Sequence, residues 1–257
     1  MTRHTTTMTL DDAQHFSEAQ KAEIISSYQP HEREARTKGV PTMGRGRVFP
    51  IAEEMVVFDA FPIPKHWHRI VGIDFGYDHP FAAAWIAWNR DADCIYVYDC
   101  YRVREQTPIL HAPALKSRGA KIPVAWPHDG LQHDKGSGEE LAQQYRNQGV
   151  MMLPERAEFP DERGNGVEAG VTEMLDRMQT GRLKIARHLN EVWEEFRLYH
   201  RAPPANGYGE SKIVKVFDDL LSAIRYAMMC VRYARPEQQP KDRYANGRSS
   251  GGSAWAA

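Results

Sequence analysis

Four aspartates stand at places in the sequence where carboxylates can do chemistry. Asp74 lies near the end of one apolar run, Asp129 follows another, and Asp218 and Asp219 open an apolar helical segment. A lone carboxylate near the end of a buried strand loses roughly several kcal/mol of hydration free energy, and a partner must compensate for this loss. A metal ion is one such partner for Asp74, and a backbone or arginine contact is the other.

Acidic residues from separate elements can form an oxygen-rich site for a hard cation. Mg²⁺ and Mn²⁺ prefer carboxylate and water ligands to cysteine and histidine. Two such ions can activate a water and stabilise the departing oxygen in phosphodiester cleavage. Each acid also has a purely structural interpretation, since Asp218 and Asp219 can cap a helix and Asp129 can be a turn residue before Gly130.

The elements that must position these acids follow from apolar patterning. Residues 69–75, 81–88 and 94–102 are predicted to form three successive antiparallel strands. Later segments alternate between helix and strand: a helix from residue 108, a strand at 122–126, a helix at 137–148, a strand at 150–153, a helix at 167–179, a strand at 183–185, a helix from 190, an extended piece at 211–217 and a helix at 218–233. This order predicts an α/β fold, with a mixed central sheet of three antiparallel strands followed by parallel strands, flanked by helices.

Composition limits the class of protein. The 257 residues carry a formal net charge of -1, so no global positive field indicates a nucleic-acid partner, although a local basic face remains open. The three cysteines form no CxxC pair, and their odd number argues against a disulfide framework, which indicates a reduced cytoplasmic setting. No apolar run approaches the roughly 18 residues of a membrane helix.

The domain organisation follows from where the core pattern begins and ends. We expect residues 1–67 to form an arm or linker, residues 68–233 to form the main domain, and residues 234–257 to form a disordered polar tail. Within the domain, the loop at 207–209 is expected to be the tip of a hairpin that gates the acidic site.

Three motifs together resemble a known family. They are Gly72-Ile73-Asp74-Phe75-Gly76, Trp126-Pro127-His128-Asp129-Gly130, and the helix Asp218-Asp219-Leu220-Leu221-Ser222-Ala223-Ile224-Arg225-Tyr226. In this order they resemble the nuclease domain of tailed-phage terminase large subunits. Upstream, residues 11–13, 33–36, 39–41 and 44–49 resemble the connector that follows the ATPase motor in that family, so the likeness covers roughly residues 10–233.

The resemblance implies an RNase H-like fold and a metal-dependent endonuclease that cuts concatemeric double-stranded phage DNA during genome packaging. It implies that two Mg²⁺ or Mn²⁺ ions are held by Asp74, Asp129 and either Asp219 or Asp218. The family often has an acid where this chain has Ser222. We favour Asp219 because it stacks with Ala223 at i, i+4, and the small side chain of Ala223 would let the helix approach the sheet closely.

The resemblance also implies partners and a location. The partners are DNA, a portal ring and the terminase small subunit, with no membrane, on the procapsid in the host cell cytoplasm and not in the mature virion. No Gly-x-x-x-x-Gly-Lys-Ser/Thr motif occurs in the sequence, so we expect a nuclease domain separated from its ATPase motor, which cleaves DNA but does not translocate it.

Nuclease chemistry also needs groups that hold the phosphate backbone. The candidates for a basic DNA-binding face are Lys212, Lys215, Arg225, Arg182 and Lys184. His79 and His128 lie close in sequence to Asp74 and Asp129 and could orient a water or a phosphate, whereas most loop histidines do neither.

Other functions remain open at this stage. One is a junction resolvase or transposase core on the same fold, although the chain shows no sign of the dimer or target-specific DNA domain that these need. Another is a catalytically silent packaging or docking module whose acids are structural. An actin-like ATPase needs two related lobes, and no second copy of Gly-Ile-Asp-Phe-Gly occurs.

Overall fold

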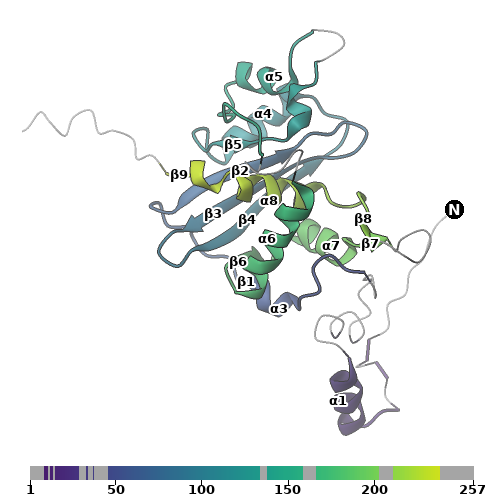
Figure 1. The fold of residues 1–257 in the computed structure, drawn as a ribbon. Helices are drawn as coiled ribbons and strands as arrows, with labels where there is room; N and C mark the ends of the chain where they lie inside the picture. The colour runs from purple at the N-terminus through teal and green to yellow at the C-terminus, as the bar shows by residue number, and fades with distance from the viewer. Residues whose placement is uncertain are drawn as a thin grey trace, which may run out of the picture.

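A mixed sheet forms the centre of the molecule (Figure 1). The computed structural model describes residues 46–133, 138–158, 166–202 and 211–237, together with residues 9, 10, 12, 13, 15–28, 33 and 37. The sheet has seven strands, β1 (Val57–Phe58), β2 (His68–Asp74), β3 (Phe81–Asn89), β4 (Cys94–Val103), β5 (Val124–Ala125), β6 (Leu183–Ala186) and β9 (Arg235–Pro236). Their order is β1-β6-β4-β3-β2-β5, with β9 paired to β2.

The strand directions confirm the predicted fold class. β2 pairs antiparallel with β3, and β3 pairs antiparallel with β4. β5 then runs parallel to β2, while β6 runs parallel to β4 and β1 runs parallel to β6. The sheet is therefore three antiparallel strands extended by parallel ones.

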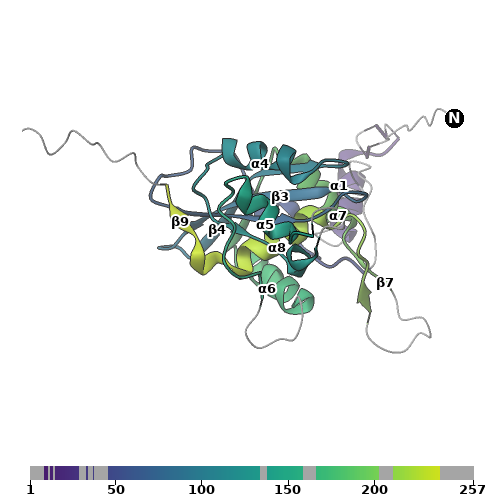
Figure 2. The same ribbon diagram turned by 90° about the horizontal axis from the view of Figure 1, so that it is seen from above.

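Helices cover both faces of this sheet (Figure 2). They are α3 (Glu53–Val56), α4 (Pro108–Ser117), α5 (Leu141–Asn147), α6 (Val167–Gln179), α7 (Asn190–Leu198) and α8 (Asp219–Met229), with short 3₁₀ turns η2 (His128–Leu131) and η3 (Val231–Tyr233). Helix α1 (Glu18–Ser27) has no buried residue and stands apart from the sheet in Figure 1. Coverage on both faces explains why residues 81–87 of β3 are apolar without alternation and fully buried.

Helix α8 lies against the middle of the sheet and sets the position of two of the acids. A Cβ atom at Gly72 of β2 would lie only 1.8 Å from the carbonyl oxygen of Ala223 in α8. Only glycine permits this approach, so the Gly72–Ala223 contact presses the first turns of α8 onto β2. The expected close approach at Ala223 is present, and its partner in the sheet is Gly72.

The main core extends beyond the predicted domain limits. Val48, Phe49 and Val56 are buried in the same core as the sheet, and β1 pairs with β6, although we placed these residues in the N-terminal arm. At the other end, β9 pairs with β2, although we placed it in the tail. In both cases a short segment completes an edge that the long strands leave open.

Some predicted elements are shorter than expected. The strand predicted at 150–153 is reduced to one bridge between Met152 and Val124. The extended piece predicted at 211–217 forms β8 (Lys212–Ile213), which pairs with β7 (Arg201–Ala202), and the predicted hairpin tip at 207–209 lies outside the described residues. In the part of the chain that the structure describes, no helix has the length and apolar character needed to span a bilayer.

Candidate active site

Two of the acids come to one edge of the sheet because their strands run parallel. Asp74 is the last residue of β2, and Asp129 lies in η2, four residues after the end of β5. β2 and β5 pair in parallel, so their carboxyl ends meet at the same edge. Open α/β sheets place ligand groups at such edges.

The other two acids arrive on α8. Asp218 is its N-cap residue and Asp219 its first helical residue, and neither side chain makes a capping hydrogen bond in this helix. Because α8 packs on β2 through Gly72, its first turn lies beside the end of β2. The helix-capping interpretation of these two aspartates is therefore not supported by the hydrogen bonds.

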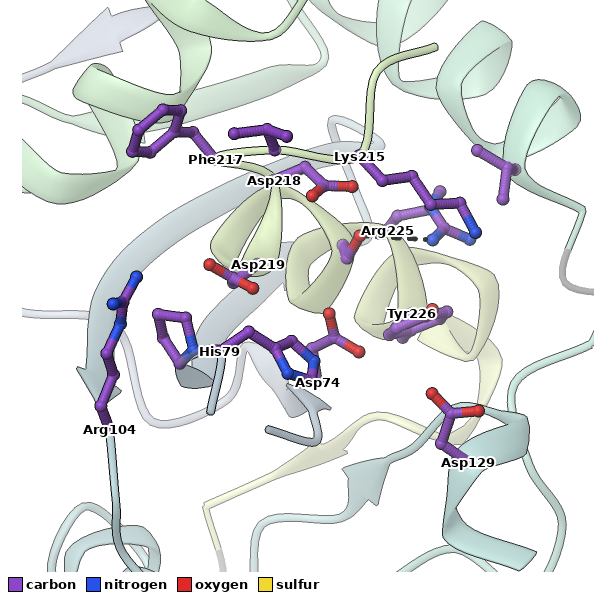
Figure 3. A pocket seen from close by; sticks show the side chains of 14 residues that line it. Asp74, His79, Arg104, Asp129, Lys215, Phe217, Asp218, Asp219, Arg225 and Tyr226 are labelled. Atoms are coloured by element: carbon purple, nitrogen blue, oxygen red, sulfur yellow. Dashed lines mark hydrogen bonds between the residues drawn. The ribbon is translucent and has the colours of Figure 1, made fainter. Parts of the chain in front are cut away.

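All four acids line one cavity of about 450 Å³. Figure 3 shows Asp74, Asp218 and Asp219 around the start of α8, with Asp129 set apart on η2 near Tyr226. Among the described residues, no group of three or more His, Cys, Asp or Glu side chains is arranged to hold a metal ion as it stands. The acids share a cavity but are not drawn together in it.

The electrostatics of Asp74 show the cost of gathering these charges. The pKa of Asp74 is raised well above its usual value, first by burial and then by the neighbouring charge of Asp219. Arg225 opposes this shift, and Asp218 and Asp129 add to it. A buried carboxyl surrounded by other carboxyls favours its neutral form unless a cation compensates.

Asp218 and Asp219 share the same direction of shift. Burial raises the pKa of Asp218 and Asp219 alike, and the charge of Asp219 raises that of Asp218 further. The positive charges of Arg225 and Lys215 lower the pKa of Asp218 in opposition to this shift. Those of His79, Arg102 and Arg104 do the same for Asp219.

A divalent cation with a preference for oxygen fits this donor set. The four carboxylates supply hard oxygen ligands, and a cation among them would remove the like-charge repulsion that raises their pKa values. Asp219 raises the pKa of Asp74 more than Asp218 does, which places the charge of Asp219 electrostatically nearer to Asp74.

The predicted basic face is only partly assembled at this cavity. Lys215 and Arg225 line it, but Arg225 is 4% exposed and stacks on the ring of Tyr226, so it is a buried counter-charge. Lys212 is exposed on β8 and does not line the cavity.

Two of the predicted basic residues are engaged elsewhere. Arg182 pairs with Asp93 and Asp176, and Lys184 donates to the carbonyl oxygen of Met55. Neither lines the acidic cavity, so the five candidates do not come together there. The physical reason is that β6, which carries Lys184 and follows Arg182, pairs with the far end of β4, away from Asp74.

Of the two candidate histidines, His79 and His128, only one lies at the acidic cavity. His79 lines the cavity, and its charge lowers the pKa of Asp219. His128 contacts Arg156 and does not line the cavity. His79 is therefore the histidine placed to act there.

Sequence reasoning missed a fully buried glutamate behind the site. Glu195 of α7 is 0% exposed, and its Oε2 atom accepts hydrogen bonds from the backbone N–H groups of Leu220 and Leu221 at 2.8 and 3.0 Å. Its Oε1 atom accepts from Arg102 at 2.9 Å. Glu195 thus caps α8 directly beside Asp219 and ties the helix to β4.

A sequence signal for Glu195 did exist. It lies at i+3 from Val192 and is followed by Phe196 and Tyr199, so it occupies the apolar face of its helix. Burial raises the pKa of Glu195 to about 7, although the α8 backbone and Arg102 both oppose the shift. Arg104, which also lines the acidic cavity, had no comparable signal.

Comparison with known proteins agrees with this geometry. A family model described as the terminase RNaseH-like domain matches residues 71–230, and one described as the N-terminal part of T4likevirus-type terminase large subunits matches residues 1–55. The terminase large subunit of Salmonella phage P22 is 48% identical over 228 residues, which is 89% of this chain and 44% of that protein. The chain therefore spans less than half the length of this curated relative.

Solved structures extend the likeness to the fold. The nuclease domain of the P22 large terminase matches with a TM-score of 0.67 and 46% identity, over 76% of this chain and 97% of that one. The large terminase nuclease domain of bacteriophage SPP1, solved with bound Mn, shares the fold with a TM-score of 0.51 and 16% identity, over 68% and 95% of the two chains. With a family model that covers most of its length and a close relative in phage P22, the chain belongs to the terminase RNaseH-like domain family.

Proposed function

We propose that this chain is the metal-dependent endonuclease domain of a phage DNA-packaging terminase large subunit. In this proposal it cleaves concatemeric double-stranded DNA by two-metal phosphodiester hydrolysis with little sequence specificity. The observation that carries the proposal is that Asp74, Asp129, Asp218 and Asp219, from three separate parts of the chain, line one cavity. The nuclease domain of its P22 relative and the Mn-bound SPP1 domain support it.

The acidic residues of the cavity are the proposed metal ligands. Asp74, Asp129 and Asp219, with Asp218 as the alternative third ligand, would hold Mg²⁺ or Mn²⁺. When bound, two such ions supply a water of lowered pKa and neutralise charge that develops on the phosphate. No covalent bond between the enzyme and the DNA is needed.

Positive side chains at the same cavity would hold the phosphate backbone. Arg104 and Lys215 line it beside the acids, and His79 is placed to donate a hydrogen bond to a phosphate oxygen or a water. Contacts from these groups to phosphate oxygens carry no sequence information, which supports the proposed low sequence specificity. Buried Arg225 would act by balancing the charge of Asp74 and Asp218.

The partners follow from the family. The whole packaging protein would act with a portal ring and the terminase small subunit on the procapsid in the host cytoplasm, and the N-terminal match to terminase large subunits is consistent with an adjoining ATPase motor. These assignments are proposals for the assembly from which this domain comes.

The direct test is cleavage of supercoiled plasmid with Mn²⁺ or Mg²⁺. We expect nicked and linear products with the wild type and none with Asp129→Asn. Asp59→Asn is the matched control, because the Asp59 side chain is 83% exposed and pairs with Arg187. Equal cleavage by Asp129→Asn and wild type would refute the proposal, and cleavage confined to four-way junctions would favour a resolvase. Metal-dependent cleavage that is absent altogether would favour a silent docking module.

A further inference from the structure

A second cavity adjoins the acidic one and has a different character. It measures about 660 Å³ and shares His79 and Asp129 with the acidic cavity. Its walls come from the turn after β2, the start of α4, η2 and α5: Phe75, Gly76, Tyr77, His79, Gln106, Thr107, Pro108, Ile109, His111, Asp129, Gln132, Leu141, Gln144 and Tyr145. We refer to this cavity as the side pocket.

The side pocket lacks the charges that hold phosphates. No lysine or arginine is among the described residues that line it, whereas Arg104 and Lys215 line the acidic cavity. A phosphate group would therefore be held at the acids, and whatever enters the side pocket is uncharged or weakly polar.

Aromatic and apolar side chains stand open at its mouth. Tyr77 is 56% exposed and Ile109 is 63% exposed, although both are large apolar residues that normally bury against a partner. The aromatic side chains of Tyr145, which is 1% exposed, and Phe75, which is 5% exposed, line the buried part of the pocket. The pocket offers flat apolar surfaces to a planar ligand.

Polar groups are interspersed among these surfaces. Gln106, Gln132 and Gln144 each bring a side-chain amide, a group that can donate and accept hydrogen bonds. Gln106 Oε1 already accepts from the Tyr101 hydroxyl, and Gln132 Nε2 donates to Asp129 Oδ1, so these two amides are partly engaged. Deeper in the wall, His111 is 2% exposed and bonds Tyr145 through Nδ1 at 2.6 Å, while its Nε2 atom has no hydrogen-bond partner within the described part of the chain. Apolar faces with amide edges match a nucleobase, which has flat faces and a polar rim.

We propose that the side pocket binds one nucleobase of the DNA strand whose phosphate lies at the acids. This inference rests on the proposed nuclease function. Asp129 and His79 border both cavities, so one nucleotide could place its phosphate in one and its base in the other. The base must leave the helical stack to enter, and stacking on Tyr77 offsets part of that free-energy cost.

A base pocket of this kind is consistent with low sequence specificity. Every nucleobase has a π-face, so stacking on an exposed tyrosine accepts all of them. Its effect is to hold the strand in a distorted form beside the acids, which favours sites where the duplex opens readily.

Photochemical cross-linking tests the contact without requiring cleavage. The probe is a short duplex in which every thymine is replaced by 5-iododeoxyuridine, mixed with the Asp74→Asn variant and Mn²⁺, irradiated and mapped by mass spectrometry. Complete replacement makes the register of the duplex unimportant. We expect the main adduct at Tyr77 and none at Tyr233, another exposed tyrosine (41% exposed) on η3. A main adduct elsewhere, with none at Tyr77, would overturn the proposal.

Plasmid cleavage by ring variants is the second arm. Tyr77→Ala should lower the rate about tenfold, the usual size of one lost base–aromatic stack. Tyr77→Phe keeps the ring and should recover most of the rate that Tyr77→Ala loses, while Tyr233→Ala, outside the pocket, should cut at the wild-type rate. Tyr77→Ala cutting at the wild-type rate, or Tyr77→Phe as slow as Tyr77→Ala, would overturn the base contact.

The two arms separate the base pocket from the nuclease proposal. An adduct at Tyr77 in a protein whose wild type cuts no DNA would support the pocket and refute the nuclease. Normal cleavage by the wild type, with no Tyr77 adduct, would refute the pocket alone.

Discussion

Two aspartates at opposite ends of β3 have opposite surroundings. Asp74 pairs in register with Ala82 near the start of β3, and Asp93 follows its end in the turn to β4. Burial and other carboxylates raise the pKa of Asp74. Burial would also raise the pKa of Asp93, but hydrogen bonds from Trp88 and Arg182 and the charge of Arg177 outweigh it, and the net shift is downward.

This difference is our reason for proposing a functional role for Asp74 and a structural one for Asp93. Asp93 is paired with two arginines at 2.9 and 3.3 Å, so its charge is satisfied within the fold. Asp74 lies among acids whose combined charge the fold only partly balances through Arg225. Strongly perturbed carboxyls in a cleft indicate a site for an external cation.

The largest expected effect is the loss of activity in Asp74→Asn. We expect plasmid cleavage to fall by at least about 100-fold, as when one charge-stabilising group of an active site is removed. The thermal unfolding midpoint in metal-free buffer should stay the same or rise, because a buried like charge has been removed. Asp93→Asn is the control, and comparable loss of cleavage in both variants would erase the comparison.

Glu195→Gln should lower activity by about 10- to 100-fold, the usual cost of losing a group that orients a metal ligand. The amide keeps one acceptor for the α8 backbone but turns N–H donors toward Arg102, so α8 loses its tie to β4. Titration of the cleavage rate with Mn²⁺ should show weaker metal binding, so that a higher Mn²⁺ concentration is needed for half-maximal cleavage.

Glu194→Gln provides the matched control for this variant. Glu194 is the neighbouring residue, with a side chain that is 64% exposed and 3.8 Å from the same arginine. Activity equal in the two variants would mean that Glu195 does not position α8.

Gly72→Ala should destabilise the protein by about 3 kcal/mol, at the upper end of the usual cost of overpacking. The added methyl would meet the backbone of α8, which cannot move aside as a flexible side chain can. Chemical denaturation measures the change, and cleavage should fall as well because α8 carries Asp218 and Asp219. Unfolding free energy unchanged from the wild type would show that α8 does not press on β2.

The smallest effects concern stability against pH in metal-free buffer. The folded pKa of Asp93 lies below its ordinary value of 3.8, so its contribution is present above that pH and is lost as pH falls through the folded pKa. Asp93→Asn should therefore cost about 0.5 kcal/mol at neutral pH, as for a partly exposed pair, and nothing in strong acid.

Asp74 should show the opposite pH dependence. Its folded pKa lies above 3.8, so its charge destabilises the fold increasingly as pH rises from 3.8 to the folded pKa. Asp74→Asn should relieve this cost at neutral pH and not below 3.8. Denaturation curves at several pH values for both variants would check the two signs, and a common sign would contradict the contrast.

Sequence patterning was sufficient for the parts of the molecule that depend on local order. The antiparallel strands β2, β3 and β4 follow from apolar runs separated by polar turns. The three acidic motifs were also visible, because each lies next to an apolar element whose end it marks. The roles of these acids and of their metal ions stay predictions.

The tertiary structure decided which charged groups share a space. Arg182, Lys184 and His128 were as plausible in sequence as Lys215 and His79, yet only the latter two line the acidic cavity. Residues far apart along the chain meet through strand pairing and helix packing, as when Glu195 reaches the start of α8. The sequence by itself determined the order of the elements and the acids at their ends, and the parallel pairing of β2 with β5 and the packing of α8 on Gly72 decided that these acids line one cavity.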